Sequence, residues 1–104
     1  MYGKKHGTFN KDGQFVVFNC ADYANNAELL LSHLFGSIKG AYTGADSTRE
    51  GLLKRSDGGM LFLDEVHRLP PEGQEMLFTF IDKGIYRPLG ESAQVHEASV
   101  QIIG

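Results

Sequence analysis

Two adjacent carboxylates, Asp64 and Glu65, directly follow an apolar run at residues 60–63. A carboxylate at the end of a buried strand can hold a magnesium ion, either directly or through water. A second carboxylate beside it can polarise a water molecule for attack on a phosphate. Side chains alternate in direction along a strand, so two adjacent acids can take both roles. The pattern therefore predicts phosphate chemistry here, and the simpler interpretation is a strand whose acidic end caps the next turn.

A second unusual stretch, at residues 40–45, has two glycine-alanine pairs around one aromatic and one hydroxyl side chain. Its residues are Gly40, Ala41, Tyr42, Thr43, Gly44 and Ala45. The stretch carries no charge, and its glycines tolerate backbone conformations that other residues avoid. We interpret it as a flexible loop whose bare tyrosine is available for contact with another protein. The simpler interpretation is a glycine-rich turn.

The histidines and the single cysteine do not form a metal-site pattern. The histidines are His6, His33, His67 and His96. Their spacing fits no metal-ligand motif, so we interpret all of them as surface or packed side chains. Cys20 cannot form an internal disulfide, and we expect it to lie in the core. One unpaired cysteine fits a reducing, cytoplasmic compartment.

Composition excludes several other classes of protein. The chain has 104 residues, of which 41% are hydrophobic, and this excludes an intrinsically disordered chain. The net charge is −3, and the 10 lysines and arginines are scattered, so nucleic acid is not the expected partner of this segment. No apolar run is long enough to cross a membrane, and we expect no membrane partner. The length allows one domain or a piece of one.

Apolar runs and helical periods alternate along the chain. The runs at 14–19, 60–64 and 98–103 predict buried strands. Between them, residues 25–36 and 69–84 show the spacing of amphipathic helices. Strands that alternate with helices predict an α/β fold with a mostly parallel sheet.

Two further segments complete the predicted elements. Ser47 and Glu50 have the spacing of a capping box, which predicts a short helix over residues 47–56. Residues 85–98 are rich in turn-forming residues and predict a hairpin or a loop before the last strand.

The loop at 40–45 and the acidic strand end, separated by a helix and Asp57-Gly58-Gly59, resemble a known family. This is the AAA+ ATPase domain of bacterial enhancer-binding proteins, the activators of sigma-54 RNA polymerase. Its hallmark loop reads Gly-Ala-Phe-Thr-Gly-Ala, and Tyr42 here replaces the phenylalanine. The resemblance covers nearly all of residues 14–104. The sequence around 64–84 is similar to that of levanase-type regulators of sugar phosphotransferase operons. It implies a partial P-loop NTPase fold, a three-layer sandwich with strand 60–64 in the middle of a parallel sheet.

The resemblance also implies roles for individual residues at an ATP site. Asp64, as part of a Walker B element, would hold Mg²⁺, and both Asp64 and Glu65 would face the nucleotide. Glu65 would polarise the attacking water. Asn19 would hold Glu65 in an inactive pose, since an amide can donate a hydrogen bond to a carboxylate. The simpler interpretation of Asn19 is a strand-end residue that caps the next turn.

The same resemblance implies a partner for the loop. The six residues of 40–45 would contact the sigma-54 factor and, through it, RNA polymerase. The parent would assemble as a hexameric ring in the cytoplasm, and a separate domain would bind DNA. ATP hydrolysis would drive the remodelling of a closed promoter complex into an open one.

The sequence departs from the family pattern because it contains no G-x-x-x-x-G-K-[ST] phosphate-binding motif. We therefore expect residues 1–104 to be the central part of the ATPase domain, without Walker A, sensor and lid, and to be inactive as an ATPase alone. Two alternatives remain open. One is another AAA+ motor, such as a branch-migration helicase, and the other is a nucleotide-free module that uses the loop for protein binding.

Overall fold

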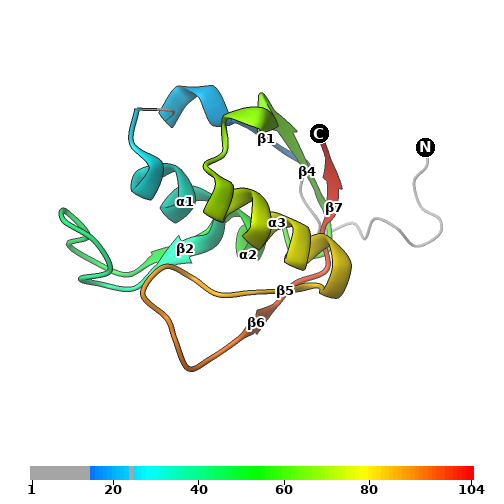
Figure 1. Ribbon diagram of the computed structural model, residues 1–104. Coiled ribbons are helices and arrows are strands. Elements are labelled where there is room, and N and C mark those ends of the chain that lie inside the picture. The colour runs from blue at the N-terminus through cyan, green and yellow to red at the C-terminus, as the bar shows by residue number, and fades with distance from the viewer. Residues whose placement is uncertain (1–14, 24) are drawn as a thin grey trace.

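The computed structural model describes residues 15–23 and 25–104 and shows an α/β arrangement (Figure 1). The strands are β1 (Phe15–Asn19), β2 (Gly36–Ser37), β3 (Arg49–Glu50), β4 (Met60–Asp64), β5 (Ile85–Tyr86), β6 (His96–Glu97) and β7 (Gln101–Ile103). The α-helices are α1 (Ala27–Phe35), α2 (Leu52–Arg55) and α3 (Pro71–Lys83). Two 3₁₀ turns follow β1 and β4, η1 (Cys20–Tyr23) and η2 (Val66–Arg68).

The main sheet has three parallel strands in the order β1-β4-β7. The predicted order, with residues 60–64 in the middle, is confirmed. In the register of the sheet, Asn19 pairs with Asp64 and Met60 pairs with Gln101. The last strand begins at Gln101 rather than at residue 98. Two parallel strands that end together place their last residues at one edge, which matters for the site below.

The helices gather on one side of this sheet, with α3 and α1 lying across it (Figure 1). Alternate residues of β4, Leu61 and Leu63, are fully buried on that side. On β1, Phe15 and Val17 pair with Met60 and Phe62 and therefore face the other side of the sheet, where they are 64% and 60% exposed. Within the described residues, the sheet therefore has one apolar face under helices and one apolar face open to solvent.

Among the described residues, helix α1 supplies more buried apolar side chains to the core than any other element. Its buried side chains include Leu30, Leu34 and Phe35, each no more than 1% exposed. The helix starts at Asn26, whose side-chain oxygen accepts a hydrogen bond from the Leu29 amide at 3.1 Å. The burial of these large apolar groups is the main stabilising contribution that the sequence makes.

The short helix predicted over residues 47–56 is wrong in its first half. Arg49 and Glu50 form β3, which pairs antiparallel with β2, and α2 begins only at Leu52. The capping box of Ser47 and Glu50 does not form. The physical reason is a tertiary contact: the backbone N–H and C=O groups of this segment form their hydrogen bonds with β2 and are therefore not available to a helix. The hairpin predicted within 85–98 is confirmed by the antiparallel pair of β5 and β6.

Among the described residues, every helix is too short or too polar to cross a membrane.

Candidate functional site

Asp64 ends β4, and its parallel neighbour β1 ends at Asn19. The register pairs these two residues directly, and Glu65 follows at the same edge of the sheet. Both carboxylates are exposed, and Asp64 Oδ1 accepts a hydrogen bond from the Glu65 amide at 3.0 Å. Ligands of open α/β sheets bind at the carboxyl ends of the strands. The fold thus brings the three residues of the predicted ATP site to the place where such a site is expected.

Glu65 has an unusual backbone conformation. Its φ of 57° and ψ of 43° lie in the left-handed region, and it is the only non-glycine residue with positive φ among those described. Such a conformation costs about 1–2 kcal/mol and persists where the surroundings enforce it. Its carboxylate Oε1 lies 3.4 Å from Nε2 of His67, and the two side chains are 42% and 71% exposed respectively.

Asn19 is engaged elsewhere. Its Oδ1 accepts a hydrogen bond from the Ala21 amide at 2.9 Å, which caps η1 as the simpler interpretation expected. No hydrogen bond joins Asn19 to Glu65, although both are described residues. The role of Asn19 in holding Glu65 therefore stays a prediction.

Cys20 lies directly below this edge and is fully buried, as predicted. Burial raises the pKa of the Cys20 thiol, and the negative charge of Asp64 raises it further. The thiol therefore stays protonated at neutral pH and acts as a small apolar side chain. Within the described residues, no group of three or more histidine, cysteine or acidic side chains gathers to hold a metal ion.

The loop at 40–45 forms the end of a hairpin whose arms are β2 and β3. Figure 1 shows it projecting from the body of the domain, away from the three-stranded sheet. The Gly40 amide donates to the Ala45 carbonyl at 2.9 Å, and the Ala45 amide donates to the Tyr42 carbonyl at 3.0 Å, so the tip closes on itself. Thr43 is exposed, whereas Tyr42 is only half-buried rather than bare.

The segment between β5 and β6 supports one side of this loop, a contact that the sequence did not indicate. The Ile38 amide donates to the Leu89 carbonyl at 3.0 Å, and the Leu89 amide donates to the Gly36 carbonyl at 2.9 Å. Gly90 has a φ of +83°, and a Cβ there would lie 2.8 Å from Cβ of Ala41. The two hairpins are therefore fastened together at the base of the loop.

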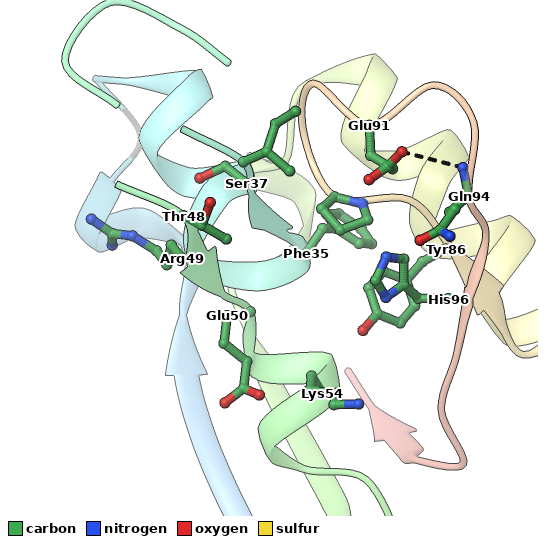
Figure 2. A pocket seen from close by; sticks show the side chains of 13 residues that line it. Phe35, Ser37, Thr48, Arg49, Glu50, Lys54, Tyr86, Glu91, Gln94 and His96 are labelled. Carbon is green, nitrogen blue, oxygen red and sulfur yellow. Dashed lines mark hydrogen bonds between the residues drawn. The ribbon is translucent and has the colours of Figure 1, made fainter. Parts of the chain in front are cut away.

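Beneath that base lies a cavity of about 370 Å³ between the two hairpins (Figure 2). Phe35 and Tyr86 line its inner wall, and the Tyr86 ring lies 5.6 Å from the ring of His96. Burial raises the pKa of Tyr86, and the nearby charges of Asp57 and Glu50 add to the effect. The lining comes from segments distant in the sequence, which is why no sequence motif marks the cavity.

Arg49 of β3 ties the root of the loop to α1. Its Nη1 lies 2.8 Å from Nε2 and 3.0 Å from Nδ1 of His33. The His33 ring stacks on Tyr23 with the ring centroids 4.4 Å apart. Burial lowers the pKa of His33, and the Arg49 charge lowers it further, because both disfavour the imidazolium.

With this geometry established, similarity to known proteins identifies the family. The family model of the sigma-54 interaction domain matches residues 4–104. The chain belongs to this family.

Its curated relatives are transcriptional regulators. The transcriptional regulatory protein LevR of Bacillus subtilis is 58% identical over 89 residues, which cover 86% of this chain and 10% of LevR. DagR of Salmonella typhimurium is 60% identical over 88 residues, covering 85% of this chain and 9% of DagR. The chain thus spans about a tenth of the length of these relatives. The expected likeness to levanase-type regulators is confirmed.

Solved structures agree on the fold. NtrX from Brucella abortus superposes with a TM-score of 0.74 at 27% identity, covering 88% of this chain and 19% of NtrX. A structure of NtrX in complex with ATP gives a TM-score of 0.71 at the same identity, covering 88% of this chain and 18% of that one. The sigma-54 interaction domain described here therefore has the α/β fold of AAA+ proteins.

Proposed function

We propose that this chain is the central part of a sigma-54 interaction domain that couples ATP hydrolysis to the activation of transcription. The observation that carries the proposal is the family match over residues 4–104. In this proposal, Asp64 and Glu65 serve the hydrolysis of ATP, and the loop at 40–45 contacts the sigma-54 factor. In this proposal, the complete protein is cytoplasmic, assembles as a hexameric ring and acts on RNA polymerase. A separate domain of it binds DNA.

The residues at the end of β4 fit a nucleotide-bound magnesium ion. Asp64 is exposed, and a hard carboxylate oxygen is the kind of ligand that Mg²⁺ prefers. Because no cluster of three such protein ligands occurs in the described residues, the ion would complete its shell with water and phosphate oxygens, as is usual for Mg²⁺. Bound there, it would neutralise charge on the transferring phosphate. The NtrX structure with ATP supports the choice of nucleotide.

The chain's own residues would then divide the work. Asp64 would hold the ion, and the hydrogen bond that its Oδ1 accepts from the Glu65 amide restrains the carboxylate. Glu65 accepts a proton from, or polarises, the attacking water as a general base. Asn19, which pairs with Asp64 in the register of the sheet, would hold Glu65 in an inactive pose.

The loop supplies the partner contact. Its tip stands clear of the sheet, and the exposed hydroxyl of Thr43 is available to a partner. Gly40, Ala41, Gly44 and Ala45 add little bulk, so the Tyr42 ring can turn outward when a partner arrives. A compact aromatic beside a hydroxyl group can give both apolar area and a directed hydrogen bond.

A second candidate function is a protein-binding module that does not use nucleotide. The observation in its favour is that residues 1–104 contain no G-x-x-x-x-G-K-[ST] motif to cradle the phosphates. The branch-migration helicase alternative receives no such support, because the family match includes the loop at 40–45.

The deciding experiment uses a chimera in which this chain replaces the matching stretch of LevR. We expect the chimera to hydrolyse ATP and Glu65→Gln to lower turnover by about a hundredfold or more while ATP binding persists. The reason is that the amide preserves size but is a poor base. Turnover is measured as phosphate release, and binding by calorimetry.

The matched control is Glu72→Gln, which makes the same chemical change at an exposed acid in the first turn of α3. It should leave turnover unchanged. Equal turnover for the two variants, or a folded chimera that never hydrolyses ATP, would favour the module that does not use nucleotide.

A further inference from the structure

The carboxylate of Glu65 has a neighbour other than the asparagine that the family resemblance indicates. Its Oε1 lies 3.4 Å from Nε2 of His67, two residues further along the chain. Asn19 meanwhile uses its Oδ1 to accept a hydrogen bond from the Ala21 amide at 2.9 Å. Among the described residues, the Glu65 carboxylate thus has a close contact with His67 and no hydrogen bond to Asn19.

The backbone explains why His67 can reach Glu65. Residues two apart on an extended strand are separated by about 6–7 Å. Here Glu65 turns into the left-handed region with a φ of 57°, and the next residues coil into η2. The Arg68 amide donates to the Glu65 carbonyl at 2.9 Å and closes this turn. The turn folds the chain back on itself and brings the imidazole beside the carboxylate.

A strained conformation at this residue is informative in its own right. A non-glycine residue in the left-handed region costs free energy, and such residues cluster at functional sites where the surroundings hold them. The conformation lies at Glu65, the residue assigned to water activation, and at no other described non-glycine residue. The backbone strain and the side-chain contact with His67 therefore occur at the same residue, Glu65.

We propose that His67 is a positioning residue that restrains Glu65 in a resting orientation between rounds of ATP hydrolysis. This inference rests on the proposed ATPase function. The imidazole lies 3.4 Å from the Glu65 oxygen, and in this proposal it competes with the attacking water for access to that oxygen. Because both side chains are exposed, the contact is weak and can be broken and remade at little cost. In this proposal His67 acts through Glu65 and is not itself a ligand of the nucleotide.

The test measures basal ATP turnover in the LevR chimera with two substitutions at one position. His67→Ala removes the restraint and should raise kcat about two- to fivefold, the range expected for the loss of one exposed pair. The KM for ATP should not change, because His67 does not bind nucleotide. His67→Gln retains a side-chain N–H donor and should return kcat towards the value of the unsubstituted chimera.

The matched control is Arg68→Ala, which removes an exposed side chain from the same 3₁₀ turn and should leave kcat unchanged. Circular dichroism confirms that each variant is folded. The inference is overturned if His67→Ala leaves kcat unchanged or lowers it, if the alanine and glutamine variants behave alike, or if the effect falls on KM. A folded, unsubstituted chimera without ATP turnover contradicts instead the proposed function.

Discussion

The strand end at Asp64 and the loop at 40–45 are held in place in opposite ways. Asp64 ends a central strand whose Leu61 and Leu63 are fully buried, with parallel partners on both sides. The loop is fixed only at its base, by β2, β3 and the backbone of Leu89. Groups that share one reaction need fixed geometry, whereas a contact with a moving partner needs freedom. Under the proposed function, this difference would separate the chemistry at the strand end from the partner contact at the loop.

The same contrast recurs between the root and the tip of the loop itself. At the root, a Cβ on Gly51 would lie 2.3 Å from the Gly36 amide nitrogen, a distance at which the backbone must shift. At the tip, a Cβ on Gly44 would meet nothing within 4 Å, although its φ is +95°. The root is therefore closed by contact between backbones, and the tip is limited only by its own conformation.

The largest expected effect exploits that contrast. Gly51→Ala should lower the free energy of unfolding by about 3 kcal/mol, the upper range for forcing extra volume into a packed site. Gly44→Ala is the matched control and should cost only about 1–2 kcal/mol, the strain of a left-handed alanine. Urea unfolding of the 104-residue chain measures both. Equal losses would mean that the root is no tighter than the tip.

An intermediate effect tests the fastening between the two hairpins. Gly90→Ala adds a Cβ that would lie 2.8 Å from Cβ of Ala41 at a φ of +83°, so left-handed strain and overlap together should cost about 2–3 kcal/mol and displace the loop base. Amide hydrogen exchange should become faster at Ile38, whose amide donates to Leu89. Unchanged exchange at Ile38 in a destabilised variant would show that the second hairpin does not support the loop.

The smallest effect is a pH dependence at His33. Its pKa is lowered from the usual 6.5 in the folded chain, so the unfolded chain binds a proton more readily. Stability from this group is fully present above pH 6.5 and is lost as the pH falls through the lower folded pKa. The difference in unfolding free energy between the chain and its His33→Phe variant should therefore shrink as the pH falls below 6.5.

His33→Phe keeps a flat ring to stack on Tyr23 and removes the titration, together with the contact between the imidazole and Arg49. Arg49→Gln is the companion variant, because it removes the neighbouring positive charge and should weaken the pH dependence without abolishing it. A difference that stays constant across this pH range would exclude His33 as the source.

The strand order could be predicted from the sequence, because the family resemblance and the right-handed crossover rule both place residues 60–64 in the middle of the sheet. Apolar runs that end in polar residues mark buried parallel strands, and parallel strands must end at one edge. The position of the loop at 40–45 was also predictable, because two glycine-alanine pairs interrupt every regular period. These features are determined by residues that lie close together in the sequence.

The remaining features depend on contacts between backbones far apart in the chain. Ser47 and Glu50 have the spacing of a helix cap, yet pairing with β2 draws Glu50 into a strand. The bonds between Ile38 and Leu89 involve only main-chain atoms and leave no side-chain signature. The contact between Glu65 and His67 depends on one left-handed residue, which no local pattern of side chains foretells.

The most direct test of the separation between chemistry and partner contact is Thr43→Ala in the LevR chimera. Two quantities are measured on the same preparation: phosphate release, and open-complex formation by sigma-54 RNA polymerase. Thr43 is exposed, and the loop between β2 and β3 that carries it projects away from the three-stranded sheet, so its loss should abolish open-complex formation and leave basal ATP hydrolysis largely intact.

Ser47→Ala, which removes an exposed hydroxyl just outside the loop hexapeptide, is the control and should affect neither quantity. The predicted result is a loss of open complexes alone in Thr43→Ala. A fall of ATP hydrolysis and open-complex formation in the same proportion would contradict the account, because the loop would then belong to the catalytic machinery.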